Sequence, residues 1–392
     1  MGFFSGRVTF ARFKVKGRLP GMFGPEHLER LEGHAIGKQR TAAGDGVEAG
    51  WGGGAHILDT AFDLEKNVVN DTLHFALRID TSRLPSDLLR AYTQIELEAL
   101  AAGNPSGLPS ARQKREARET ARERLEDEAK DGRFLKRKAF PVLWDAPSNE
   151  LLVGTTAVTA LDRLHTLFEH TFGQGFELLS AGRSAFRLAQ SRRQTAAIDD
   201  AAPSAFVPEL ATDEVAWLPD ETGRDFLGNE FLVWLWFMLD SDSDTIALAD
   251  GSEAALMLTR TLMLECPRGQ TGRESISSDA PARLPEARQA LQAGKLPRRA
   301  GLTIVRHDQQ YDLTLSAESL AVSGARLPAP EAVEERARLE ERVGQLRHLL
   351  ETLDLLFDAF VEKRASEGWV KELGRIQKWL RRDDGGRRAA IG

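Results

Sequence analysis

The chain has 392 residues, of which 42% are hydrophobic and 28% are charged, and its formal net charge is −7. This length and composition are typical of a globular protein with two or more domains. Cys266 is the only cysteine, which excludes an intramolecular disulfide and a zinc site built from cysteines. The longest apolar run, Phe231 to Leu239, has nine residues, far fewer than the roughly 20 that span a bilayer. The N-terminus has no signal-peptide pattern, so we expect a cytoplasmic protein without a membrane segment.

The negative net charge is concentrated in one segment. Residues 206–259 contain 12 acidic residues and one basic residue, Arg224, so the remaining 338 residues carry a net charge of +4. A chain that is mildly basic outside one acidic segment is consistent with one basic binding surface.

The first 180 residues predict an N-terminal α+β unit of helices and antiparallel strands. Strands are expected at about 7–16, 72–80 and in a hairpin over 140–156, and helices at 25–35, 84–102, 111–130 and 158–172. Pro85 stands in the first turn of its helix, where proline is tolerated, and Gly173 ends the last helix. We interpret residues 84–141 as a charged arm that projects from this unit.

The rest of the chain predicts a boundary and a second unit. Residues 181–205 are small, polar and irregular, which is typical of a linker. A second α+β unit is expected over 206–325, with an aromatic helix around "FLVWLWFML", followed by a C-terminal helical region (326–382) and a basic tail (383–392).

Apolar residues recur with heptad spacing in the C-terminal helical region. The seam consists of Leu339, Val343, Leu346, Leu350, Leu353, Phe357 and Phe360. Such a seam is typical of a helix that packs against another helix. The residues leave two interpretations open: packing within the chain, or pairing with a second subunit.

Known catalytic motifs are missing from the sequence. The "DSDSD" run at 240–244 resembles the start of a calcium loop, but Thr245 and Gly251 stand where glycine and glutamate are required. The chain has no H-E-x-x-H, G-x-S-x-G or phosphate-loop motif. We therefore predict no catalytic residues, no metal, no cofactor and no enzymatic activity.

The predicted helix that begins at residue 111 has separate basic and acidic sides. Residues 111–141 contain 11 Lys/Arg and 7 Asp/Glu. On a helical projection of about 100° per residue, one arc holds the basic residues Lys114, Arg115, Arg118 and Arg122. The apolar stripe is thin, so the helix is expected to project into solvent. The basic side continues into Arg133, Lys136, Arg137 and Lys138. The residues alone allow either a solvated face or a face that contacts phosphates.

The order of several short motifs resembles the RdgC family of bacterial recombination-associated proteins. These motifs are Gly50-Trp51, Leu84-Pro85, Lys138-Ala139-Phe140, the hairpin "LWDAPSNELLV", the stretch "ALQAGKLPRRAGLTIVRHDQQYDLTLSAESL" and the helix "QLRHLLETLDLLFDAF". The resemblance covers most of the chain and rests on the order of motifs, since each one alone is weak. Glycines follow Gly50-Trp51 here, where prolines are usual in the family.

The resemblance implies a fold and a function. It implies an α+β protomer with mixed antiparallel sheets and long helices, elongated and curved, that forms a ring-shaped homodimer. Double-stranded DNA would pass through a basic channel without sequence preference, and the protein would restrain RecA by occupying DNA. This predicts a cytoplasmic, nucleoid-associated protein.

The same resemblance assigns residues to two kinds of contact. Phe140 and Lys138 are expected at a subunit contact at the arm tip. The turn residues Arg268, Gln270 and Arg273 are expected to face the channel. We add from the heptad pattern that Leu346, Leu350, Leu353 and Phe357 form the opposite subunit contact.

A different class of function is a protein-interaction scaffold. Its acidic block or heptad helix would bind a basic or helical partner without any DNA binding.

Overall fold

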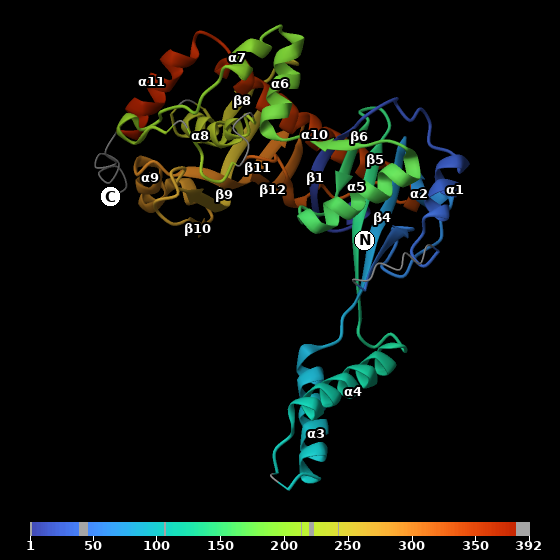
Figure 1. Ribbon diagram of the computed structural model, residues 1–392. Coiled ribbons are helices and arrows are strands. Elements are labelled where there is room, and N and C mark those ends of the chain that lie inside the picture. The colour runs from blue at the N-terminus through green and yellow to red at the C-terminus, as the bar shows by residue number, and fades with distance from the viewer. Residues whose placement is uncertain are drawn as a thin grey trace.

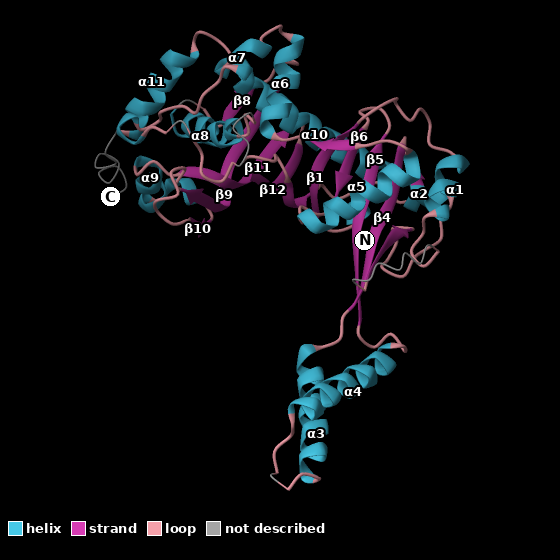
Figure 2. Cartoon of the chain, in the orientation of Figure 1, coloured by secondary structure: helices cyan, strands magenta, loops and turns pink. Residues whose placement is uncertain are grey.

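The computed structural model describes residues 2–38, 46–105, 107–212, 214–218, 223–241 and 243–381. Its strands form a 13-stranded sheet whose paired neighbours are antiparallel (Figures 1 and 2). The strands are β1 (Val8–Val15), β2 (Val47–Gly52), β3 (Val68–Val69), β4 (Thr72–Ser82), β5 (Leu135–Asp145), β6 (Glu150–Val153), β7 (Phe176–Leu178), β8 (Thr245–Ala247), β9 (Glu253–Glu265), β10 (Glu274–Ser278), β11 (Leu296–Arg306), β12 (Gln309–Ser316) and β13 (Val322–Arg326). The main strand order is β10-β9-β11-β12-β13-β1-β6-β5-β4-β2.

Strand β1 joins the two halves of the sheet. Its first residues pair with β13 through Val8 and Phe10, and its later residues pair with β6 and β7. The N-terminal strands β1 to β7 and the C-terminal strands β8 to β13 therefore belong to one continuous sheet. The expected α+β class with antiparallel strands is confirmed.

The helices cover opposite faces of the two halves. They are α1 (Pro25–Gly33), α2 (Leu64–Asn67), α3 (Ser86–Ala102), α4 (Ala111–Ala129), α5 (Val158–Phe172), α6 (Ala181–Ser191), α7 (Thr195–Asp199), α8 (Phe226–Ser241), α9 (Pro285–Gln292), α10 (Glu335–Arg364) and α11 (Trp369–Leu380), with short 3-10 helices η1 (Gly2–Phe4), η2 (Pro208–Leu210) and η3 (Pro281–Arg283). Phe13 of β1 shares a core with α1 and α5, whereas Phe10 shares a second core with α6 and α8 to α11. Because neighbouring residues of a strand point to opposite faces, the two cores lie on opposite sides of the sheet.

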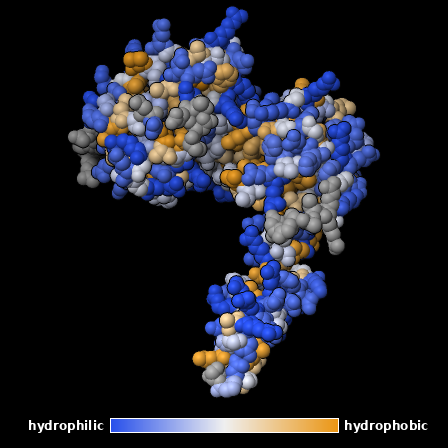
Figure 3. Space-filling model, in the orientation of Figure 1, coloured by the Kyte–Doolittle hydropathy of each residue, from blue (hydrophilic) through white to orange (hydrophobic). Residues whose placement is uncertain are grey.

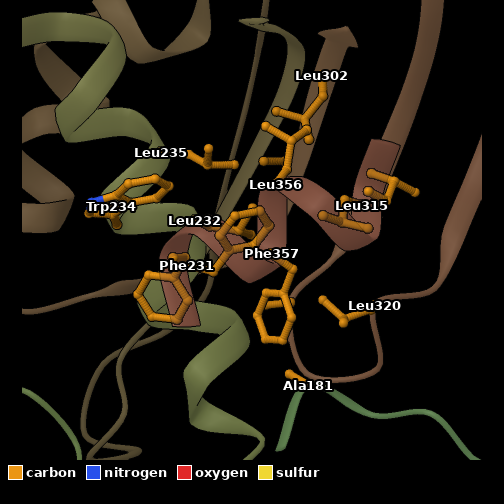
Figure 4. Close-up of a cluster of buried hydrophobic side chains, with 14 of the residues drawn as sticks. Ala181, Phe231, Leu232, Trp234, Leu235, Leu302, Leu315, Leu320, Leu356 and Phe357 are labelled. Carbon is orange, nitrogen blue, oxygen red and sulfur yellow. The ribbon is translucent and has the colours of Figure 1, made fainter. Parts of the chain in front are cut away.

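The aromatic helix α8 is a core element, as its unbroken apolar run predicts. Phe231 packs edge-on against Phe357 of α10, with ring centroids 5.2 Å apart. Figure 4 shows Phe231, Leu232 and Leu235 of α8 gathered with Leu356 and Phe357 of α10 and with Leu302 and Leu315 of the sheet. The helix is buried around its circumference because it lies between the sheet and neighbouring helices.

The segment expected to be a linker is helical, so that prediction is wrong. Residues 181–205 include α6 and α7, and Ala181, Ala185 and Ala189 are buried in the core that contains α8. Small residues are needed here because α6 and α8 approach closely: a Cβ added at Gly228 would meet the Cβ of Ala181 at 3.0 Å. The small residues of this segment therefore reflect tight packing between helices, and not a linker.

Two further expectations concern the C-terminal part of the chain. The predicted helical region contains α10 and α11, whereas the basic tail 383–392 lies outside the described residues. Over the part of the chain that the structure covers, no helix combines the length and the apolar character needed to cross a bilayer.

Candidate nucleic-acid interface

A helical arm projects from the N-terminal half of the sheet (Figure 1). Strands β4 and β5 pair over eleven positions, from Thr72 opposite Asp145 to Ser82 opposite Leu135. β6 pairs with only the last four of these β5 residues, so the other end of the ribbon extends beyond it. Helices α3 and α4 form an antiparallel hairpin at the end of this ribbon.

Helix α4 packs on α3 through its thin apolar stripe. Ala117, Ala121 and Leu125 are buried, and their spacing of four residues places them on one side of the helix. Tyr92 of α3 donates its hydroxyl to Glu128 at 2.9 Å, and the Arg124 guanidinium lies 4.1 Å from the centroid of the Tyr92 ring. These contacts attach one side of α4 to α3 and leave its other sides exposed to solvent, as the sequence predicts.

The four basic residues predicted on one arc of α4 are all exposed. Arg122 pairs with Glu126 at 2.8 Å, but both side chains are more than half exposed, so the pair adds little stability. Among the described residues, Lys114, Arg115 and Arg118 make no ion pair. Their charges are therefore available to a polyanion.

The basic run at the root of the arm divides between two faces of the ribbon. Lys136, Arg137 and Lys138 are exposed on β5. Lys136 and Lys138 point to one face, and Arg137 points to the other, 3.6 Å from Asp80. Asp80 is already held by Arg78 at 2.6 Å. Asp80 therefore offsets the charge of Arg137 only in part, and the Arg137 guanidinium can contact an external partner.

Arg133 is less available than the sequence predicts. Its guanidinium pairs with Asp131 at 2.6 Å and with Glu128 at 3.4 Å. The hydrogen bond to Asp131 raises the pKa of Arg133 above its usual value. The two carboxylates offset its charge within the turn after α4.

The structure contradicts the expected position of Phe140 at the arm tip. Phe140 lies in β5 opposite Leu77, half-buried against the core that contains α5. The far end of the arm is instead the loop between α3 and α4, where Leu108 is 71% exposed. Phe140 therefore anchors the root of the arm to the body, with Lys138 two residues farther out on the same face.

The heptad residues are also wrong as a subunit contact. Leu346, Leu353 and Phe357 are buried in the protomer's own core, so a second chain cannot reach them. Leu350 is half-buried and lines a cavity of about 490 Å³ together with Leu188. The long apolar seam arises because α10 packs on α8 and the sheet, which is the other interpretation that the sequence left open.

The three predicted turn residues lie at the other end of the sheet from the arm. Arg268, Gln270 and Arg273 belong to the connection between β9 and β10, and Arg273 binds Glu265 at 2.9 Å. Burial would raise the pKa of the Cys266 thiol, but hydrogen bonds from the Thr271 hydroxyl and from the backbone N–H groups of Arg268, Thr271 and Gln270 lower it to about 7. The turn is thus organised around the thiol, and the structure does not bring its side chains next to the arm.

The sequence interpretation missed an open sheet face in the C-terminal half. Leu256 and Leu302 point into the core, whereas the alternate residues Met257 and Thr303 point away from it. The open face carries the basic residues Arg260, Arg299 and Arg326 and many hydroxyl side chains. Period-two alternation of leucine and threonine in β9, β11 and β12 was the signal that predicts a strand with one open face.

Several described residues of the acidic block are used inside the protomer. Glu230 is buried against Arg364 at 2.6 Å, and Asp240 accepts a hydrogen bond from the Trp379 indole at 2.7 Å. Asp250 accepts a hydrogen bond from Arg306. The first two contacts attach α10 and α11 to α8, and all three reduce the charge that a basic partner would meet.

Within the described ranges, no group of three or more His, Cys, Asp or Glu side chains is arranged to hold a metal ion. Neither the protein-family models nor the curated proteins contain a match to this chain.

Proposed function

We propose that the protein is a homodimer that binds double-stranded DNA without sequence preference and restrains RecA-type recombination. The observation that carries the proposal is the projecting α4 helix, whose exposed Lys114, Arg115 and Arg118 make no ion pair in the described structure. A helix held away from the body, with its basic side free, suits contact with a phosphate backbone more than it suits stabilisation of the fold. In this proposal the protein works in the cytoplasm on nucleoid DNA and performs no catalysis.

The open sheet face supplies further basic groups, although Asp312 pairs with Arg260 there at 3.0 Å. It lies on the side of the sheet that carries α5, opposite α8 and α10. The arm extends below the body in Figure 1, and Figure 3 shows that its visible surface is mostly hydrophilic. Basic groups on the arm and on the open face are a pattern suited to backbone contact, which carries no base-sequence information.

The proposed dimer uses apolar residues of the arm in place of the buried heptad. Leu88 and Ile95 stand seven residues apart on α3 and are 37% and 53% exposed. Leu108 at the arm tip is more exposed still. Apolar side chains along a charged projection and at its tip are a suitable contact for the arm of a second copy.

Gel shifts on unrelated duplexes at several salt concentrations test the DNA binding. The variant Lys114→Glu/Arg115→Glu/Arg118→Glu is expected to bind all duplexes more weakly. If each side chain contacts one phosphate, the slope of log K against log salt should fall by about 2.7 per protomer. A strong preference for one duplex sequence, or no binding at low salt, would contradict the proposal.

A control with the same change in net charge separates the arm from the charge of the whole protein. Lys371, Lys378 and Arg381 are exposed on or just after α11, far from the arm. Their reversal to glutamate is expected to affect binding much less. Equal losses in the two variants would show that total charge, and not the arm, governs binding.

The effect on recombination follows from occupancy of the duplex. Wild-type protein is expected to slow RecA-catalysed strand exchange when it is added to the duplex first, and the arm variant is expected not to. Inhibition by the arm variant at full strength would mean that the effect does not arise from DNA binding.

A further inference from the structure

Strand β10 ends the sheet at the C-terminal half and leaves one edge unpaired. β9 pairs with one side of β10, and no other described strand pairs with its outer side (Figure 2). Ser275 and Ser277 are exposed, and Ile276 between them is half-buried against the core. Natural edge strands are commonly protected by lysine, proline or a bulge, but the sequence "ESISS" contains neither residue and pairs with β9 in continuous register.

The residues around β10 are self-complementary about Ile276. In an antiparallel pair of two β10 strands centred on Ile276, Arg273 of each copy stands opposite Asp279 of the other. Ser275 then stands opposite Ser277, and Ile276 meets its own copy. Opposite charges and small hydroxyl side chains in facing positions favour strand pairing.

Neighbouring registers lack this match. A centre at Ser275 places Glu274 opposite Ile276, and a centre at Ser277 places Asp279 opposite Ser275. Only the Ile276-centred register of these three opposes Arg273 to Asp279. Since a two-fold axis repeats each contact, that register provides two such charge pairs.

Both charged residues are accessible for this contact. The Asp279 side chain is exposed, and the Arg273 side chain is 54% exposed. Arg273 uses Nε and Nη2 to bind Glu265, so its Nη1 group remains available to a facing carboxylate. Arg273 and Asp279 flank β10 directly, and extending its alternation by one residue at each end places them on the same face as Ser275 and Ser277.

We infer that β10 pairs with β10 of a second copy of this chain, antiparallel and centred on Ile276, so that the sheets of two protomers join. β10 and the arm belong to opposite halves of the protomer (Figure 1). The inference rests on the homodimer of the proposed function but is independent of its DNA binding.

Cysteine cross-linking tests the register directly. The natural Cys266 is buried and is replaced first, in the background Cys266→Ala. Ile276→Cys should then form a disulfide-linked dimer under mild oxidation, because facing Cα atoms of an antiparallel pair lie about 4.5–5.5 Å apart, within the range that a disulfide spans. Ser278→Cys is the matched control: it is also half-buried, but the pairing places it opposite Glu274. No dimer from Ile276→Cys, or equal dimer from both variants, would overturn the inference.

A charge exchange provides a second test that leaves the core unchanged. Asp279→Arg places arginine opposite arginine and is expected to raise the dimer dissociation constant by about tenfold, as measured by sedimentation. Arg273→Asp/Asp279→Arg restores opposite charges and should recover most of the loss. Glu265 loses its ion pair with Arg273 in that variant but still has Arg298 as a partner at 2.8 Å. An unchanged dissociation constant in Asp279→Arg would overturn the inference.

The two proposals fail in distinguishable ways. A protein that shifts duplex DNA but shows neither the cross-link nor the charge effect refutes β10 pairing alone. A cross-linked dimer that binds no duplex refutes the DNA-binding function alone.

Discussion

Arg12 connects the two halves of the protein, and its replacement should be strongly destabilising. Its guanidinium binds Glu150 at 2.9 Å and Asp354 of α10 at 2.6 Å, and the Arg12 and Glu150 side chains are each only 5% exposed. Arg187 also binds Glu150, at 3.0 Å. Arg12→Met would leave two carboxylates with half-exposed Arg187 as a partial partner.

The expected loss follows from the burial of this ion network. Removal of one partner from a buried pair typically costs about 3–5 kcal/mol, and Arg187 places the expected value near 3 kcal/mol. Arg12→Met/Glu150→Leu should recover about half of that loss, because replacement of both buried charges avoids an unpaired carboxylate. Urea unfolding of the wild type and both variants measures these differences.

Two results would refute this reasoning. A loss below about 1 kcal/mol for Arg12→Met would show that the network contributes little. A double variant less stable than the single variant would show that Glu150 is not the uncompensated charge. The pH dependence gives a further check: although burial opposes it, Arg12 lowers the pKa of Asp354. The resulting stability should be present above about pH 4 and lost as the pH falls below it, in the wild type more than in Arg12→Met.

Substitutions at His74, Gly301 and Gly344 give separate predictions about stability. Burial, with a smaller effect of the N-terminal amine, lowers the pKa of His74 to about 3, so the folded protein keeps this imidazole neutral while the unfolded chain protonates near pH 6.5. Stability should therefore fall as the pH decreases from about 6.5 toward 3, and His74→Leu should flatten that part of the curve in thermal melts; an unchanged curve would contradict the assignment. A Cβ at Gly301 would overlap the carbonyl oxygen of Thr259, so Gly301→Ala should cost about 1–3 kcal/mol. Gly344 is at an exposed position of α10, where an added Cβ meets nothing within 4 Å, so Gly344→Ala should add up to about 1 kcal/mol of stability. Equal effects of the two changes in urea unfolding would refute the close approach at Gly301.

The sequence by itself predicted most individual elements because their signals are local. Periodicity and capping residues placed α3, α4 and α5 within a few residues of their observed ends, and Gly173 ends α5 in the left-handed conformation. The charge segregation on α4 also depends only on helical spacing, and the exposed residues agree with it. The alternating pattern of β1 and β4 was sufficient to identify both strands.

Only the tertiary structure decided which faces are buried and against which partner. The heptad of α10 is the same whether it meets a second subunit or the protomer's own sheet, and Phe231 of α8 is what covers Phe357. The small residues of 181–205 were interpreted as a linker. They are small because α6 approaches α8 closely, and this contact joins positions that are far apart in the sequence. Phe140 likewise lies at the root of the arm because β5 pairs with β4 there. Periodicity shows that a face exists, but burial depends on non-local contacts that no single segment encodes.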